Sequence, residues 1–122
     1  MRPLHHPAID DVSIEGILYA LSDPARAHIY ASIAAASNPQ TCSTFLEISD
    51  RQLPKSTLSL HFKVLREAGL IRSERRGVEL HNSARCEELN QRFPGLMPAI
   101  VAAYRSQNAR PDKARRRRAR RG

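Results

Sequence analysis

The stretch from residue 54 to residue 77, PKSTLSLHFKVLREAGLIRSERRG, decides the fold of this chain. Leu58, Phe62 and Leu65 recur at i, i+4 and i+7, the spacing that places side chains on one face of an α-helix. We therefore expect a helix over residues 54–68 whose apolar face is packed against the rest of the protein.

The opposite face of this helix carries hydrogen-bond donors and positive charge. Such groups suit the phosphate oxygens and base edges of DNA. The side chains that fall off the apolar stripe are Thr57, Ser59, Leu60, His61 and Lys63, of which Leu60 alone lacks a donor. We expect His61 on the exposed face, where it could donate to a phosphate or a base; capping of a neighbouring backbone group is the alternative.

A basic hairpin follows the helix. Gly69 stands where a helix commonly ends in a left-handed residue. A strand then begins at Leu70, turns near residues 75–77 and returns through Val78 and Leu80. A helix followed by a short basic hairpin predicts a winged helix, mainly α-helical with a small β-hairpin wing.

Three further helices are expected before this segment. The first covers residues 13–22, and the second starts at Asp23-Pro24, an N-cap followed by proline at the first helical position, and runs to residue 36. Phe45, Leu46 and Ile48 predict a short third helix, which would form a helix-turn-helix with residues 54–68.

Two helices are expected after the hairpin. Ser83 could cap the first, whose apolar face would carry Cys86, Leu89 and Phe93 and which Pro94-Gly95 would end. The last helix starts at Leu96. On this interpretation Cys86 is a small core residue.

The net charge of +8 is unevenly distributed. Residues 110–122 contribute +7, which leaves +1 for the other residues, and within those the basic excess lies in residues 51–76. We expect a flexible arm at residues 1–11 that includes His5 and His6, a folded domain at 12–108, and a disordered basic tail at 109–122. A polarised body of this kind favours one DNA-binding face.

The composition argues against several other classes. Two cysteines without a secretory apolar region indicate a reducing, cytoplasmic location, and no apolar run is long enough to span a bilayer. The chain has no glycine-rich phosphate loop, paired-carboxylate site or nucleophile with an organised base, so we expect no enzyme activity and no cofactor.

The segments STLSLHFKVLREAGLI and RRG, with LSDPAR upstream, resemble the ArsR-type winged helix-turn-helix regulators of bacteria and archaea, over residues 14–104. The resemblance implies a homodimeric repressor that binds a palindromic operator and leaves it when an inducer binds. It places DNA contacts on Lys55, Ser56, Thr57, Ser59, Leu60 and His61, and a basic wing on Arg72, Arg75 and Arg76. Leu60 departs from the usual polar residue, so it would contact a thymine methyl or nothing.

The inducer chemistry of this family is mostly absent from the chain. The arsenic-type site needs converging thiolates, and the matching segment has only Cys42; the zinc-type ligands are missing from the last helix. We expect no metal. A redox or electrophile switch at Cys42 is one alternative, because a thiol near a helix start can gain thiolate character.

A palindromic site requires a dimer, and the terminal helices could supply its interface. The candidate interface residues are Ile14, Ile17, Leu18, Leu96, Ile100, Val101 and Tyr104. The alternative is that these residues close the core of the monomer.

The sequence therefore predicts a homodimeric DNA-binding transcriptional regulator, a repressor released by an unidentified small-molecule or redox inducer. One alternative is an RNA-binding or ribosome-associated basic protein, which the scarcity of aromatic residues disfavours. Another is an interaction module that has lost DNA binding. The basic tail would add non-specific phosphate contacts.

Overall fold

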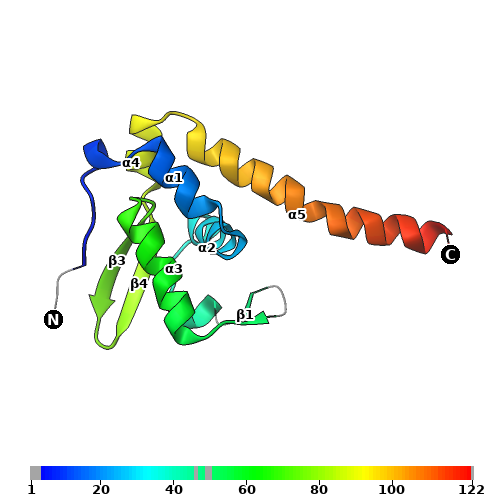
Figure 1. The fold of residues 1–122 in the computed structure, drawn as a ribbon, viewed down its shortest axis with the longest axis horizontal. Coiled ribbons are helices and arrows are strands. Elements are labelled where there is room, and N and C mark those ends of the chain that lie inside the picture. Colours follow the sequence, from blue (N-terminus) through cyan, green and yellow to red (C-terminus); the bar gives the residue numbers. More distant parts are fainter. Residues whose placement is uncertain (1–3, 46, 49–50, 122) are drawn as a thin grey trace.

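The computed structural model describes the backbone of residues 4–45, 47–48 and 51–121 and, within these, the side chains of all but 43, 47, 48, 51 and 110–121. Five α-helices and a two-stranded wing make up most of this part of the chain (Figure 1). In order the elements are η1 Ile9–Asp11, α1 Ile14–Leu21, α2 Pro24–Ala35, η2 Cys42–Phe45, β1 Glu47–Ile48, β2 Arg51–Gln52, α3 Lys55–Glu67, β3 Ile71–Arg76, β4 Glu79–Ala84, α4 Cys86–Arg92 and α5 Leu96–Arg121.

The LSDPAR segment forms the junction between α1 and α2. Asp23 accepts hydrogen bonds from the backbone N–H groups of Ala25 and Arg26, which caps the start of α2. Arg26 reaches back and donates through Nε to the carbonyl oxygen of Ala20 at 2.7 Å, near the end of α1. One short motif therefore satisfies the ends of two helices, and the predicted boundary at Ser22 and Asp23 is confirmed.

The core lies where α1, α2 and α3 meet the base of the wing. The predicted stripe of α3 is confirmed, since Leu58, Phe62 and Leu65 are all buried. Each such side chain contributes about 1.5–3 kcal/mol through burial. The other buried apolar residues are Val12, Ile17, Ala20, Ile29, Tyr30, Ala31, Ile33, Phe45, Leu70, Ile71, Leu89 and Met97.

The end of α3 is fixed by Gly69, as predicted. Its φ of 85° is left-handed, and Leu70 N–H donates to the carbonyl oxygen of Leu65 at 3.0 Å, the pattern that closes many helices. A Cβ at this position would lie 2.3 Å from Cγ2 of Val12. Glycine is thus required for both the turn and the close approach of residue 12.

The wing is a regular antiparallel hairpin. β3 pairs with β4 from Ile71 opposite Ala84 to Arg76 opposite Glu79, and Gly77 at φ 64° forms the turn with Val78. Gln40 adds a bridge on the outer edge of β4 through two backbone hydrogen bonds with Asn82, of 2.7 and 2.8 Å. The predicted hairpin is confirmed, and its base is tied to the segment after α2.

The predicted third helix is wrong. Phe45 ends a short 3₁₀ turn, η2, and Ile48 belongs to β1, which pairs with β2; Leu46 lies outside the described residues. Phe45 is buried because its ring packs against that of Phe62 with centroids 5.8 Å apart. This contact across the core, rather than helical periodicity, accounts for an apolar residue here.

The start of α4 also differs from the prediction. Ser83 pairs with Arg72 inside the wing and so cannot cap the helix, whose N-cap position is Arg85. Leu89 is buried and Phe93 half-buried as expected, but Cys86 is exposed, so its assignment to the core is wrong.

The described structure extends beyond residues 12–108 at both ends. In the segment assigned to a flexible arm, His6 Nε2 accepts a 3.0 Å hydrogen bond from the Ser73 backbone N–H, and Arg85 donates to the Pro7 carbonyl oxygen. The backbone of α5 continues helically to Arg121, through the segment assigned to a disordered tail. Arg and Ala, which dominate that segment, favour helix. Figure 1 shows α5 leading away from the wing.

Candidate nucleic-acid interface

The exposed face of α3 is polar and basic, as the sequence indicates. Lys55, Ser56, Ser59 and Lys63 are exposed on it, and Leu60 lies among them with 57% of its surface exposed. Pro54 at the N-cap position offers no side-chain cap. The N–H groups of the first turn are therefore free of a capping side chain, which is the arrangement that favours a phosphate at a helix N-terminus.

Two of the predicted DNA-contact residues are less exposed to solvent. Thr57 is half-buried, and His61 is only 9% exposed, with its Nδ1 lacking a hydrogen-bond partner among the described residues. Position 61 is three residues after Leu58 and four before Leu65, so it adjoins the buried stripe. The prediction that His61 lies on the exposed face is wrong.

The wing carries its three arginines in different electrostatic settings. Arg72 lies 3.6 Å from a carboxylate oxygen of Glu88, and Arg76 lies 3.6 Å from one of Glu74. Arg75 has no acidic partner in the part of the chain that the structure describes. The unneutralised positive charge of the wing is therefore concentrated at Arg75.

The base of the wing is held by a second group of charges. Arg85 donates through Nε to Glu88 at 2.6 Å, and this hydrogen bond is the main reason that the pKa of Glu88 is below its usual value; Arg72 adds to the effect. Arg85 also donates a hydrogen bond to the Pro7 carbonyl oxygen and so holds the N-terminal segment. Arg72 is thus engaged with α4 on the side away from the wing tip.

A buried polar contact joins α3 to the wing, and sequence reasoning missed it. Arg66 Nη1 donates to Ser73 Oγ at 3.2 Å, and Ser73 Oγ donates to Asn82 Oδ1 at 2.5 Å. Desolvation lowers the pKa of Arg66. Ser73 and Asn82 are cross-strand partners on the inner face of the hairpin, where apolar residues are the rule. That pair of polar residues is the signal that could have revealed the contact.

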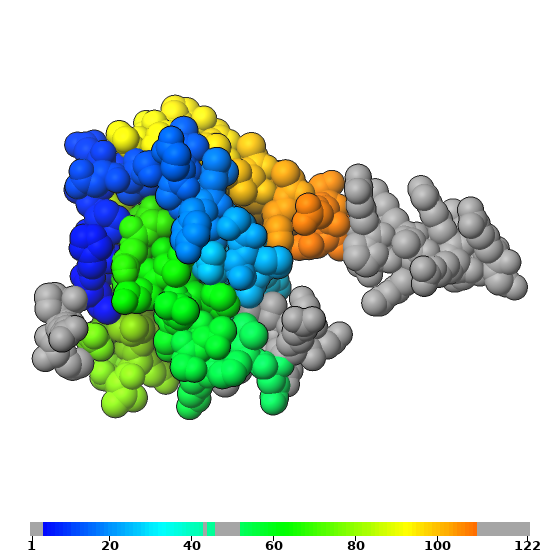
Figure 2. Space-filling view, in the orientation of Figure 1, coloured from blue at the N-terminus to red at the C-terminus, as the bar shows by residue number. Residues whose placement is uncertain are grey.

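α3 and the wing lie side by side, with β3 packed against α3. Figure 2 shows them together on the lower side of the molecule in that view. The exposed face of α3 and the wing tip therefore form one surface, which combines hydroxyl groups, ammonium groups and the guanidinium of Arg75.

The remaining predicted sites receive less support. Cys42 is half-buried, and burial raises the pKa of its thiol, which contradicts the expected gain in thiolate character. Within the described residues, no group of three or more His, Cys, Asp or Glu side chains is placed to hold a metal ion.

The dimer candidates divide into two sets. Ile14 and Leu18 of α1 are 43% and 53% exposed, but Ile17 is fully buried in the monomer core, so its assignment to an interface is wrong. Leu96, Ile100, Val101 and Tyr104 of α5 are half-buried, and the first three pack against the core. In the described part of the chain, no helix is long and apolar enough to cross a membrane.

Comparison with known proteins agrees with this geometry. A family model for a helix-turn-helix domain matches residues 21–74. Among solved structures, the chain is similar to an ArsR-like transcriptional regulator from Rhodococcus sp. RHA1, with 23% identity, a TM-score of 0.53, and coverage of 82% of this chain and 90% of the other. Among curated proteins none matches in sequence. Residues 21–74 are thus similar to a helix-turn-helix domain, and the chain has the winged helix-turn-helix fold of that regulator.

Proposed function

We propose that this chain is a sequence-specific DNA-binding transcriptional regulator that acts as a homodimeric repressor and is released by an inducer. The observation that carries the proposal is the surface formed by α3 and the wing. Lys55, Ser56, Ser59 and Lys63 are exposed on the helix, and Arg75 is free of an acidic partner within the described residues. The helix-turn-helix match over residues 21–74 supports the same function.

The division of labour follows from the shapes of the two elements. An α-helix fits the major groove, where hydroxyl and ammonium groups can reach base edges and phosphates. Ser59 and Lys63 are four residues apart and share a face of α3, so they would contact the same stretch of groove. Arg75, near the wing tip, would contact phosphate beside that groove. The Arg66–Ser73 hydrogen bond supports a fixed separation between the two contacts.

A dimer would present two copies of this surface to a palindrome. Two half-sites on one side of the duplex are centred about 34–36 Å apart. Ile14 and Leu18 lie one turn apart on α1 and are exposed, which supports α1 as part of the interface. Apolar side chains of this size are expected to become buried in a stable homodimer.

Selection of bound duplexes from a random pool would test this function. A palindrome with half-sites about one helical turn apart is expected, together with a dimer in sedimentation. Ser59→Ala combined with Lys63→Ala should weaken binding to the selected sequence, whereas Gln91→Ala, an exposed change on α4, should not. Failure to enrich any duplex, or stronger binding to RNA in competition, would overturn the proposal.

A further inference from the structure

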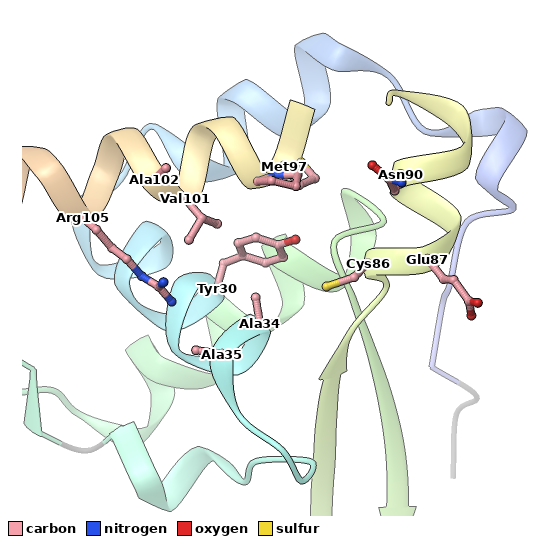
Figure 3. A pocket seen from close by; sticks show the side chains of 11 residues that line it. Tyr30, Ala34, Ala35, Cys86, Glu87, Asn90, Met97, Val101, Ala102 and Arg105 are labelled. Atoms are coloured by element: carbon pink, nitrogen blue, oxygen red, sulfur yellow. The ribbon is translucent and has the colours of Figure 1, made fainter. Parts of the chain in front are cut away.

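A cavity of about 840 Å³ opens between α2, α4 and α5, away from the α3 face (Figure 3). Its volume is within the range of pockets that hold small organic molecules, about 300–1,000 Å³. Ala34 of α2 and Met97, Val101 and Ala102 of α5 give it mostly apolar walls. Small side chains on α2 and α5 leave room between the two helices, so the cavity can accommodate a flat apolar group such as an aromatic ring.

One end of the cavity offers uncharged polar groups. The Tyr30 hydroxyl lies near the thiol of Cys86 and points into the space between α2 and α4 in Figure 3. Burial, with a further contribution from Cys86, raises the pKa of Tyr30, so its hydroxyl stays protonated. Asn90 uses Oδ1 to accept a hydrogen bond from the Gly95 N–H, which leaves its Nδ2 group to donate. Glu87 stands at this end and disfavours an anion there.

The opposite end carries a positive charge. Arg105 lines the cavity and has no carboxylate partner among the described residues. It follows Met97 by eight residues on α5, which corresponds to about 12 Å along the helix axis. The cavity is therefore elongated, with a cation at one end, apolar walls in the middle and neutral hydrogen-bonding groups at the other end.

We propose that this cavity binds a small phenolic carboxylic acid of the hydroxycinnamate type. The carboxylate pairs with Arg105, the ring lies between Ala34 and Val101, and the phenol hydroxyl bonds to Tyr30 and Asn90. A ring with a short unsaturated acid side chain is long enough to reach both ends, which benzoate is not. The binding of the acid does not depend on the proposed function. The further inference that such an acid acts as the inducer rests on the proposed function.

Titration calorimetry of the full chain with 4-hydroxycinnamate, in the absence of DNA, tests the site. The acid should bind, and its methyl ester should bind about tenfold more weakly because it lacks the charge that pairs with Arg105. Arg105→Gln should lower the affinity for the acid by about the same factor and leave the ester unchanged. Gln107→Ala, on the same helix outside the cavity lining, is the matched control.

Tyr30→Phe tests the polar end. The variant removes one hydroxyl and should reduce the affinity for 4-hydroxycinnamate while leaving that for cinnamate unchanged; a thermal melt checks that it folds. The proposal is overturned if the acid does not bind at millimolar concentration, or if the acid and ester bind alike.

A separate measurement keeps the two proposals distinguishable. The acid is added to the complex with the selected duplex, and release of DNA is followed. Release by the acid, abolished in Arg105→Gln, supports an inducer site. Calorimetric binding without any duplex selected would leave the cavity assignment standing and overturn the repressor.

Discussion

Arg66 of α3 donates a hydrogen bond of 3.2 Å to Ser73 of β3, which ties the helix whose side chains are proposed to contact DNA to the wing. The contact is buried, and Ser73 passes a second hydrogen bond to Asn82 on the neighbouring strand. These two consecutive hydrogen bonds restrict the movement of the wing relative to α3. Two contacts with DNA can then be made at a fixed separation without ordering the hairpin on binding.

Ser73→Ala should destabilise the fold by about 1–3 kcal/mol, because it leaves Arg66 Nη1 and Asn82 Oδ1 buried without this partner. The free energy of unfolding in urea measures the effect. Ser83→Ala, an exposed change on the other wing strand, should stay within about 0.5 kcal/mol of the unaltered chain. Equal effects of the two substitutions would contradict the role assigned to the buried contact.

Gly69→Ala should cost more stability than Gly77→Ala. Both glycines have positive φ, which costs another residue about 1–2 kcal/mol. Only at Gly69 would the new Cβ meet a neighbour, Cγ2 of Val12 at 2.3 Å, whereas nothing lies within 4 Å at Gly77. Thermal or urea unfolding of the two variants gives the comparison, and a larger loss for Gly77→Ala would show that the close approach to Val12 is not a constraint.

Arg75→Ala should reduce the salt dependence of DNA binding by about one phosphate contact, a change of about 0.9 in the slope of log K against log salt concentration. Arg76→Ala should change the slope less, because Glu74 already lies beside that guanidinium. Fluorescence anisotropy over a series of salt concentrations measures both slopes. If Arg76→Ala had the larger effect, the ion pair seen here would not determine which arginine contacts DNA.

The stability should depend on pH through His6. Its pKa lies below 6.5, chiefly because of burial and then because of Arg72, Arg66, Arg85 and His5. As the pH falls below 6.5, the unfolded chain therefore binds a proton before the folded chain does, and folding loses stability. The stability difference between the unaltered chain and His6→Gln should shrink between about pH 7.5 and about pH 5.5. His5→Ala is the control and should leave most of this dependence in place.

Removal of residues 110–122 should flatten the salt dependence of DNA binding. This segment has a net charge of +7, and each phosphate neutralised contributes about 0.9 to the slope. The preference for the selected duplex over a scrambled one should be unchanged, since phosphate contacts carry no sequence information. A collapse of that preference would mean that the segment reads a groove.

Local patterns predicted the elements whose determinants are close in sequence. The capping residue Asp23, the stripe of α3 and the glycine turns all act within a few residues, and each is found where expected. The hairpin register follows from the turn at Gly77.

Some of the errors have a different cause, which is a contact between distant parts of the chain. Phe45 is buried by Phe62, and Cys86 meets Tyr30. His61 adjoins the buried stripe of α3. The spacing of Leu58, Phe62 and Leu65 indicates where that stripe runs but not how many neighbouring residues it includes. The cavity near α5 likewise depends on how three helices pack.

The docking of the N-terminal segment against β3 decides where a foreign sequence can be attached to this protein. His6 bonds to the wing at Ser73, so an affinity tag fused before residue 4 would emerge beside the surface proposed to meet DNA. The helix α5 instead leads the chain away from that surface (Figure 1). A purification tag, fluorophore or surface anchor after residue 122 therefore leaves the wing accessible to DNA, whereas the salt dependence assigned to residues 110–122 is best measured without a tag at that end.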